Sequence, residues 1–328
     1  MDDLLAAVPP ACRRGIGPAP VPRLDGNDTL LEFPEWRSRR PAARLIPALS
    51  VLDGEPPAFR FELSAHVAGT WTPWVGAATL GGARFAPCPS AADTLTAEID
   101  EFVSARPAEA VRLRLRLNAA GAATLARAPW LVSVSAWDGA SEAPDRDGGA
   151  SARVTVPPRT QMEEDPAIRL RICSPTSLAM VLEHHGRRVA TAALAAEVFH
   201  AGLALYGVWP AAIRAAGRYG VTGYVLHFAG WEAAAWCLTA GLPVIASVRY
   251  AAGALTGAAI PETSGHLLVL TGSDGRRVFV NDPAAPSTEA VPRSYSLAEF
   301  LPAWLDRGGV GQVLFRPRRR GRFVAGSG

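Results

Sequence analysis

The chain of 328 residues contains no lysine, because all 33 of its Lys and Arg positions are arginine. This absence excludes a Walker A phosphate loop, a lysine Schiff base and a Ser–Lys dyad, each of which needs a lysine amine. A net charge of +3 is too small to indicate nucleic-acid binding. The sequence also lacks an apolar run long enough to span a bilayer, and its acidic start, MDDLLAAVPP, is not a secretory signal. We therefore expect no nucleic-acid or membrane partner and a cytoplasmic location; secretion, with a signal omitted from the sequence, is the alternative.

Cysteine is scarce as well, with four residues and no pair at metal-ligand spacing. The sequence also has no HExxH motif, so we expect neither a metal nor an organic cofactor. Cys12 and Cys88 could form a disulfide if the protein is exported, and Cys237, in the apolar stretch AAAWCLTAG, is interpreted as a small buried side chain. Only Cys173 has neighbours that suggest chemistry.

The first half of the chain has the alternation of β-strands. FRFELSAHV and VRLRLRLN alternate apolar and polar residues, so that Arg112, Arg114 and Arg116 are expected to point outward. WLVSVSAW predicts a third strand, and Gly, Pro and Asp fill the gaps between strands. No convincing helix interrupts them. Residues 41–140 therefore predict an antiparallel β-sandwich, preceded by an N-terminal extension over 1–40.

Four tryptophans of this half need an explanation: Trp71, Trp74, Trp130 and Trp137. Exposed aromatic rings on a sandwich face can stack on sugars, but tryptophan is buried more often than not, so packing in the core or at an edge is favoured. The ligand of the predicted sandwich, a carbohydrate or a protein, stays open.

After a linker rich in Gly, Ala, Ser, Asp and Pro, placed at 141–158, the pattern changes. Helical segments come first (SLAMVLEHH, ALAAEVFHAG, WPAAIRAAGRYG and WEAAAWCLTAG), and strand-like segments follow (PVIASVRY, HLLVLTG, RRVFVNDP and VGQVLFRP). Helices followed by an antiparallel sheet predict an α+β domain over 159–318. The arginine-rich end, 319–328, is interpreted as a solvated basic tail.

Cys173 stands where a helix is expected to begin. In RICSPTSLAMVLEHHG, Ser174 and Thr176 can cap the helix, Pro175 suits its first turn and Gly186 is a natural stop. Unpaired N–H groups and the positive end of the helix dipole favour a thiolate at that position. From this feature alone, a reactive thiol and a buried structural cysteine are equally good interpretations.

A nucleophilic cysteine needs a base, and a hairpin supplies a candidate. In SGHLLVLTGSDGRRVFVNDP, two strands are expected to flank a turn around 273–275, which places His266 opposite residues 281–283. Asp282 would then be a cross-strand or diagonal neighbour of His266, able to fix its tautomer. Uncertainty in the register leaves Asn281 as a rival, since Cys-His-Asn triads also occur. No local motif gives a similar partner to the other histidines, His66, His184, His185, His200 and His227.

These motifs carry a family resemblance. From about 158 to 318 the chain resembles the C39-like branch of papain-like cysteine peptidases, which is named after the bacteriocin-processing, double-glycine leader peptidases. The matching pieces occur in order: Gln161, CSPTSLAMVLEHHG, YGVWP, GLPVIASV, SGHLLVLTG, VFVNDP and VPRSYSLAEFLPAWL. Two features depart from the leader peptidases, because Ser-Pro follows the cysteine in place of Gly and the accompanying transporter segments are absent. The first half resembles, more loosely, sandwich domains that precede this peptidase type in some bacterial proteins.

The resemblance implies a cysteine peptidase or amide hydrolase that acts on a peptide or protein through a thioester acyl-enzyme. It implies that Cys173 attacks the carbonyl, His266 exchanges the proton, Asp282 orients His266, and Gln161 supplies an oxyanion hydrogen bond. Two alternatives stay open. The same residues could transfer the acyl group to an amine, as in transglutaminase-like proteins, or the domain could bind a peptide without cutting it.

Overall fold

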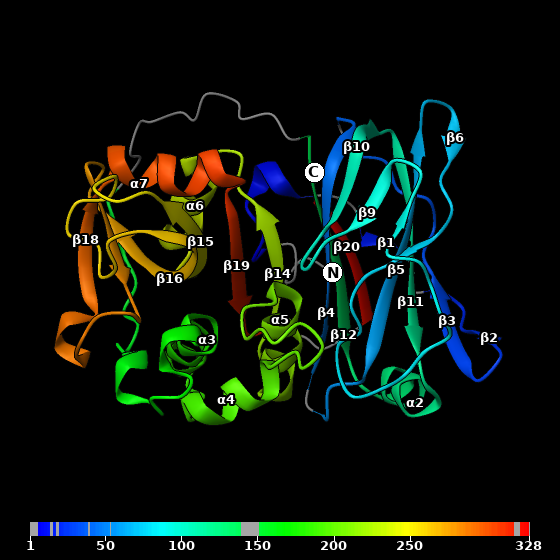
Figure 1. Ribbon diagram of the computed structural model, residues 1–328, viewed down its shortest axis with the longest axis horizontal. Helices are drawn as coiled ribbons and strands as arrows, with labels where there is room; N and C mark the ends of the chain where they lie inside the picture. The colour runs from blue at the N-terminus through cyan, green and yellow to red at the C-terminus, as the bar shows by residue number, and fades with distance from the viewer. Residues whose placement is uncertain are drawn as a thin grey trace. The chain divides into compact units, whose positions relative to one another are not determined.

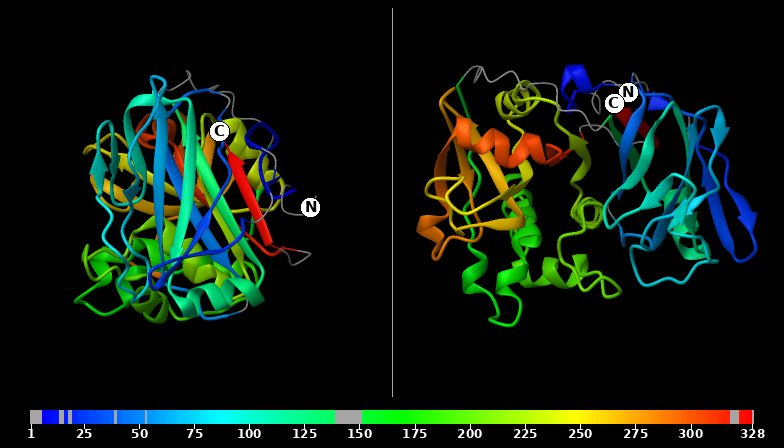
Figure 2. Two further views of the ribbon diagram at one scale, coloured as in Figure 1. Left: turned by 90° about the vertical axis from the view of Figure 1, so that its right-hand side faces the viewer. Right: turned by 45° about the horizontal axis from the view of Figure 1, so that its top comes forward.

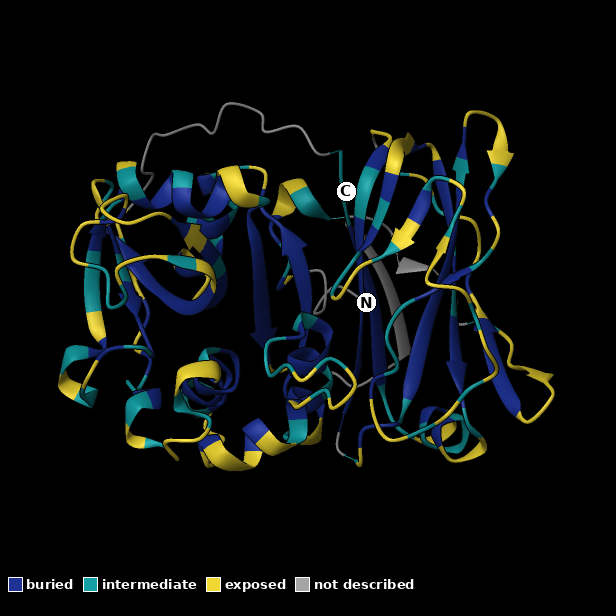
Figure 3. Ribbon diagram, in the orientation of Figure 1, coloured by how far each residue is buried: buried dark blue, intermediate teal, exposed yellow. Residues whose placement is uncertain are grey.

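The computed structural model describes residues 6–13, 20–38, 40–52, 54–138 and 151–317, with 16–17 and 322–327 described by their backbone alone. Its contacts divide the chain into two compact units. The first unit comprises residues 1–12, 141–208 and 226–317, and the second comprises 13–140, 209–225 and 318–328. Each unit has its own buried strands (Figure 3).

The second unit is a β-sandwich of two sheets (Figure 1). One sheet has the order β1 (Ile16–Gly17), β20 (Arg322–Ser327), β12 (Trp130–Trp137), β4 (Ala42–Val51), β10 (Phe102–Ala108), β9 (Leu95–Ala97) and β8 (Ala91–Ala92). The other has the order β2 (Arg23–Asp25), β3 (Asp28–Glu32), β11 (Ala110–Leu117), β5 (Phe59–Val67) and β6 (Thr70–Trp71), and β7 (Val75–Gly76) also pairs with β5. The β12–β20 pair is parallel and β5–β11 is antiparallel in full register.

The sandwich extends beyond the boundaries expected from the sequence. Strands β2 and β3 come from the segment predicted as an N-terminal extension, and β20 comes from the predicted basic tail. Two helices group with the sheets: α2 (Ala119–Arg127), which was not predicted, and α5 (Trp209–Arg218), which was predicted as a helix of the other domain. Asn118 caps α2, accepting the Gly121 N–H at 2.8 Å. Helix α5 packs on β4, although its sequence lies within the predicted α+β half.

The arginines of β11 lie on the strand face opposite its apolar residues, as predicted, but that face does not open fully to solvent. Arg116 is buried, and Glu62, which is fully buried at 0% exposure, accepts hydrogen bonds from Arg60, Arg114 and Arg116. Residues 70–89 cover this face, and Arg60 also donates to the Ala86 carbonyl at 2.6 Å. The alternating pattern therefore marks two buried faces, one apolar and one built on ion pairs.

The tryptophans of the sandwich take different places. Trp130 is buried in the core and its indole N–H donates to the Leu125 carbonyl at 3.2 Å. The Trp71 and Trp74 rings each stack against a guanidinium, with Arg112 at 3.9 Å and Arg114 at 4.2 Å from the ring centres. One face of each of these two rings is thus occupied by the protein itself.

The first unit is built on one sheet of the order β14 (Thr222–His227), β19 (Val310–Phe315), β15 (Val244–Tyr250), β16 (Thr263–Ser273), β17 (Arg277–Asn281) and β18 (Pro292–Ser296), and β13 (Ala152–Arg153) also pairs with β16. Its helices are α3 (Cys173–His184), α4 (Thr191–Val198), α6 (Trp231–Thr239) and α7 (Leu297–Trp304). Short helical turns are η1 (Pro10–Cys12), η2 (Gln161–Glu163), η3 (Arg169–Arg171), η4 (Thr288–Ala290) and η5 (Leu305–Arg307). The pairs among β15 to β19 are antiparallel, as expected for the α+β class.

Helix α3 is the central helix of this unit. Every residue from Ser174 to Leu182 is buried, so the helix is enclosed on all sides. It packs on β16, where the Ser177 hydroxyl donates to the Leu267 carbonyl at 3.2 Å, and α4 packs against it. Figure 1 and Figure 2 show α3 and α4 on one side of these strands and α7 on the other. The start of α3 is thereby fixed against the strand that carries His266.

The predicted linker is only partly described. Residues 141–150 lie outside the described residues, but 152–153 form β13, which pairs with Gly272 and Ser273 of β16. Of the predicted tail, 322–327 form β20, and the remaining positions fall outside the description. In the described part of the chain, no helix combines the length and the apolar character needed to cross a membrane.

Candidate active site

Cys173 is the first residue of α3, as predicted, but the expected side-chain caps are not formed. Ile172 is the N-cap residue and makes no side-chain capping bond, while Thr176 donates back to the Ile172 carbonyl at 2.7 Å. The thiol is hydrogen-bonded to the His266 ring and to the backbone at Leu267 and Ser174. Cys173 is partly exposed, whereas the residues that follow it in α3 are buried. Cys173 therefore lies at a helix N-terminus beside an imidazole.

His266 links the thiol to a carboxylate. The His266 Nε2 atom lies 2.8 Å from Asp282 Oδ1, and both side chains are buried, at 3% and 0% exposure. Since Nε2 is bonded to the carboxylate, the other ring nitrogen, Nδ1, is left to face Cys173. Cys173, His266 and Asp282 thus form one hydrogen-bonded chain, which we call the catalytic chain after the roles predicted for its members from the sequence.

The predicted hairpin exists, but its predicted register was wrong. Asn281 pairs with Val269, so His266 is not opposite residues 281–283. The loop lies later than expected, and the register shifts at a bulge between Leu270 and Gly272. Asp282 reaches His266 because it follows the end of β17, where its own N–H donates to the Val291 carbonyl at 2.9 Å.

Asn281, the rival of Asp282, is used elsewhere. It is buried, and its side-chain amide donates to the Val156 carbonyl at 2.9 Å. The hydrogen-bond partner of His266 is therefore Asp282.

The electrostatics of the catalytic chain favour an ion pair. Burial opposes ionisation of Cys173, but the hydrogen bond and charge of His266 outweigh it and hold the pKa of the thiol below its usual value. Burial likewise disfavours a charged imidazole, but the Asp282 carboxylate and the thiol raise the pKa of His266 to about 10. Burial also works against the Asp282 charge, and the His266 ring keeps the pKa of this carboxyl below its usual range. These shifts move the pair in the direction of a thiolate beside an imidazolium.

Comparison with known proteins gives this geometry a family. Residues 153–312 match the model of the Peptidase_C39 like family. The match covers just under half of the chain. Two solved structures resemble the chain: a protein from Bacillus anthracis described as a C39-like peptidase (20% identity, TM-score 0.40, covering 52% of this chain and 100% of that one), and the peptidase domain of Streptococcus ComA, a bifunctional ABC transporter of a quorum-sensing pathway (16%, 0.32, 48% and 96%). None of the curated proteins matches.

Gln161 lies in η2, near the start of the C39-like domain. Its backbone N–H donates to the Pro283 carbonyl at 2.8 Å, and the hydroxyl of its neighbour Thr160 bonds the Pro283 and Ala285 carbonyls. The turn is therefore tied to the loop that follows Asp282. Gln161 is buried, with 4% exposure, and within the described residues its Oε1 has no hydrogen-bond partner.

The remaining histidines of the C39-like domain serve its backbone. His184 lies between the Thr155 and Gly241 carbonyls, at 2.8 and 3.2 Å, and His185 Nε2 is 2.9 Å from the Leu314 carbonyl. Burial lowers the pKa of His185 to about 4, so its ring is neutral. His227 Nδ1 is 2.8 Å from the Gly308 carbonyl.

The other three cysteines have surroundings that differ from those of Cys173. Cys237 is buried, as expected, and burial raises the pKa of its thiol. Cys12 lies near Cys237, where η1 contacts α6, and the Cys88 thiol donates to the Trp74 carbonyl at 3.6 Å. The disulfide between Cys12 and Cys88 is not formed. Among the residues that the structure describes, no cluster of His, Cys, Asp and Glu could hold a metal.

Tyr295 is a neighbour of the catalytic chain that the sequence analysis missed. Its hydroxyl donates to Asp282 Oδ2 at 2.9 Å. Because the segment before α7 was not predicted as a strand, no register was available to bring this tyrosine to Asp282.

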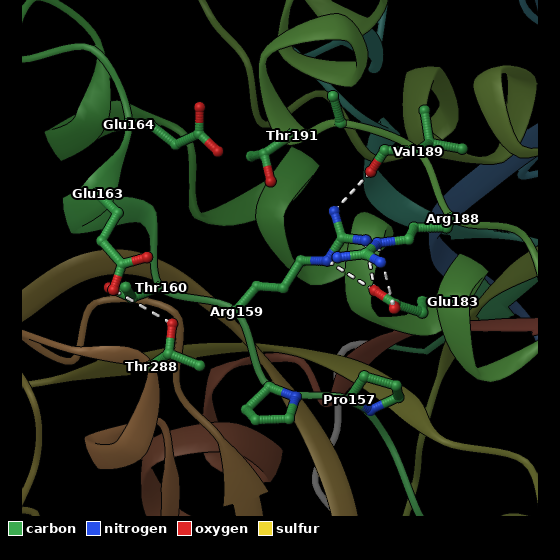
Figure 4. Close-up of a pocket in the computed structure, with 12 residues that line it drawn as sticks. Pro157, Arg159, Thr160, Glu163, Glu164, Glu183, Arg188, Val189, Thr191 and Thr288 are labelled. Atoms are coloured by element: carbon green, nitrogen blue, oxygen red, sulfur yellow. Dashed lines mark hydrogen bonds and ion pairs between the residues drawn. The ribbon is translucent and has the colours of Figure 1, made fainter.

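A separate polar cavity of about 530 Å³ lies in the same unit (Figure 4). Arg159 crosses it to Glu183 and the Val189 carbonyl, and Glu163 bonds Thr288 at 3.2 Å. The catalytic chain does not contribute to its lining, which consists of Pro157, Pro158, Arg159, Thr160, Glu163, Glu164, Glu183, Arg188, Val189, Ala190, Thr191 and Thr288. Within the wall, Arg159 and Arg188 both pair with Glu183, and we assign the cavity no ligand.

Proposed function

We propose that the protein is a cysteine hydrolase that cleaves a peptide or amide bond through a thioester on Cys173. The observation that carries the proposal is the hydrogen-bonded chain from the Cys173 thiol through His266 to Asp282, inside a segment of the C39-like family. A thiolate next to an imidazolium is both a nucleophile and a proton donor in place for the leaving group.

The reaction runs in two steps. The Cys173 sulfur attacks the carbonyl carbon, the C–N bond breaks, and the His266 imidazolium gives its proton to the departing amine. Water then gives a proton to His266 as its oxygen attacks the thioester, which releases the acid and returns the thiol pair to its starting state. Asp282 holds the His266 ring in one tautomer and stabilises its charge throughout.

Gln161 is proposed to donate a hydrogen bond to the oxyanion, together with the backbone N–H of Cys173. The anchoring of its backbone beside Asp282 supports this role, and the buried side-chain atom without a partner among the described residues, Oε1, belongs to the same amide as the Nε2 donor. A donor of this kind contributes about 10²–10³ in kcat. Gln161→Ala should therefore lower turnover by that factor and leave the alkylation of Cys173 unchanged.

The first test measures thiol reactivity and turnover together. Limiting iodoacetamide should label Cys173 faster than Cys12, Cys88 and Cys237, as read by peptide mass spectrometry, because Cys173 combines exposure with a lowered thiol pKa. Incubation with a random peptide library should give products that are lost in Cys173→Ala and kept in Cys88→Ala. Equal labelling of all four cysteines, or products that survive Cys173→Ala, would overturn the proposal.

The same experiment separates the two alternatives. An added amine that appears in the products in place of water would identify acyl transfer. Peptides that are retained by the protein and returned uncut, with Cys173 alkylated slowly, would identify a binding module instead.

A further inference from the structure

The second oxygen of Asp282 is held as firmly as the first. Asp282 Oδ1 accepts from His266 at 2.8 Å and from the Ala284 N–H at 3.0 Å, while Oδ2 accepts the hydroxyl of Tyr295 at 2.9 Å. The carboxylate is fully buried, so these donors take the place of water. Of the three, only Tyr295 acts on the oxygen that does not touch His266.

Tyr295 is placed by the sheet. It lies on β18, opposite Val278 of β17, and it is the one buried residue of that strand, with 1% exposure. Residues 282–291 connect β17 to β18, and the Tyr295 hydroxyl reaches back from the middle of this pairing to the Asp282 carboxylate, just past the end of β17. A buried phenol that finds an anion is held in one orientation by packing on its ring and by the bond to its hydroxyl.

The charges around this phenol keep it a donor. Burial and the negative charge of Asp282 raise the pKa of Tyr295, so its hydroxyl stays protonated. Tyr250 is also close enough to feel the Asp282 charge, but its hydroxyl donates to the Ile260 carbonyl at 3.3 Å. The Arg293 guanidinium also acts on both phenols. Together with His266, these are the ionisable groups that act on Asp282 and Tyr295.

We propose that Tyr295 is a positioning residue, whose hydroxyl fixes the Asp282 carboxylate and through it the plane and tautomer of His266. This inference rests on the proposed function of the catalytic chain. Tyr295 touches neither the thiol nor a reacting atom, and its effect on Cys173 passes through the Asp282 carboxylate and the His266 ring. The closest analogy in physical terms is a metal-bound histidine, whose second nitrogen is oriented by a carboxylate that is itself hydrogen-bonded.

Removing the hydroxyl should weaken the charged form of Asp282. A buried carboxylate oxygen that loses its donor bears an uncompensated desolvation cost, which favours protonation. Once Asp282 takes up a proton, the imidazolium loses its counter-charge and the thiolate loses its partner. The reactivity of Cys173 should therefore fall on the acid side of its pH profile.

The experiment compares alkylation of Cys173 in the full chain across pH. Tyr295→Phe should move the acid limb of the rate profile upward by about one pH unit, which is roughly tenfold in rate on that limb. With a cleaved peptide as substrate, kcat should fall by about 3–10-fold with little change in KM, because the variant alters the positioning of His266 and not the binding of the substrate. Tyr250→Phe is the matched control, since it removes a neighbouring hydroxyl that does not bond Asp282, and its profile should stay within about 0.2 units of the parent.

A double-mutant cycle distinguishes positioning from packing. In an Asp282→Asn background the hydroxyl of Tyr295 has no carboxylate to hold ionised, so Tyr295→Phe should no longer shift the limb. If Tyr295→Phe lowers folding stability too far to assay, fluorotyrosine incorporated in the otherwise unchanged chain replaces it as the probe. The phenol of fluorotyrosine is more acidic and is therefore a stronger hydrogen-bond donor. It should move the acid limb of the alkylation profile downward in pH. Incorporation in Tyr250→Phe should move the limb by the same amount, because the Tyr250 hydroxyl does not bond Asp282.

The outcomes separate this inference from the proposed function. A parent and a Tyr295→Phe variant with the same limb and the same kcat, while Cys173→Ala is inactive, would overturn the positioning role and leave the hydrolase intact. A shift that persists unchanged in Asp282→Asn would also overturn it. A Cys173 that alkylates like an ordinary thiol at every pH would overturn the proposed function first.

Discussion

The reactivity of Cys173 depends on opposing effects at a single residue. Burial raises the pKa of its thiol and His266 lowers it, with His266 prevailing. Replacing the ring by His266→Gln leaves only the effect of burial, which raises the pKa of the thiol. Alkylation of Cys173 at pH 7 should therefore slow by at least about tenfold, and the midpoint of the alkylation rate against pH should move toward or above 9. The measurement is the rate of iodoacetamide incorporation from pH 5 to 10.

The basic side of the same profile concerns His266. Its pKa of about 10 means that the imidazolium persists through neutral pH and is lost as the pH passes that value. Turnover should therefore decline near pH 10, while alkylation, which needs only the thiolate, should not. His185→Gln, at a ring that contacts a backbone carbonyl, is the control. Equal alkylation at pH 7 in the parent and in His266→Gln would show that the ring does not ionise the thiol.

At this scale the sequence could identify the reacting groups because their chemistry is local. A cysteine before a helix and a histidine and an aspartate in one hairpin are visible in the order of residues. Tyr295 and Glu62 could not be identified in the same way, since their partners come from other strands through tertiary pairing. The Glu62 cluster shows this most clearly, because alternation cannot distinguish an arginine in solvent from an arginine paired with a buried carboxylate.

Among the elements, helix α5 packs closely against strand β4 at Gly217. A Cβ at Gly217 would lie 2.2 Å from the Val51 carbonyl oxygen of β4, which is a backbone atom and cannot turn aside. Gly217→Ala should lower the free energy of unfolding by about 1–3 kcal/mol, even though alanine gains up to ~1 kcal/mol of helix propensity. Chemical denaturation measures it.

Gly82→Ala serves as the comparison in the same unit, because no atom lies within 4 Å of a Cβ there. It should change the stability by less than about 0.5 kcal/mol. A Gly217→Ala variant as stable as the parent would mean that α5 and β4 are less closely packed than the structure has them.

The elements themselves were predicted better than their pairing. Helices α3, α4, α5 and α6 and strands β15, β16, β17 and β19 lie where apolar periodicity indicated. The β16–β17 register was missed because a bulge adds a residue that no composition signals. Asp282 still reaches His266 because it lies just past the end of β17. Its side chain is therefore not bound by the alternation between sheet faces that fixes the direction of paired residues.

For the whole chain, the division into units does not follow the order of the sequence. The C39-like segment covers 153–312, yet residues 209–225 within it group with the sandwich, which also takes in the last strand, β20. A linker rich in Gly and Pro marks a change of composition, but it does not reveal which later segment contacts which sheet. Composition and local pattern could therefore predict two folds and their classes, whereas their true extents depended on long-range packing.

One carboxylate should make the stability of the whole protein depend on pH. The Asp100 carboxylate accepts the Trp209 N–H at the start of α5, at 2.6 Å. Burial raises its pKa to about 7, the Trp209 N–H opposes this, and the charge of Glu101 adds to it. The folded state prefers the protonated form of Asp100. The stability that this preference gives the folded protein is therefore complete below about pH 4 and is lost as the pH rises toward 7.

Thermal unfolding of the full chain between pH 5 and 8 tests this directly. The parent should lose several degrees of Tm over that range, since each kcal/mol corresponds to about 2–4 °C for a domain of 150–250 residues. Asp100→Asn still accepts the Trp209 N–H but cannot ionise, so its Tm should fall less over the same range, and it should exceed the parent most at pH 8. Asp93→Asn, at an exposed position with a left-handed backbone that asparagine also tolerates, should follow the parent. Parallel curves for the parent and Asp100→Asn would show that this carboxylate is ionised in the folded protein at every pH in the range.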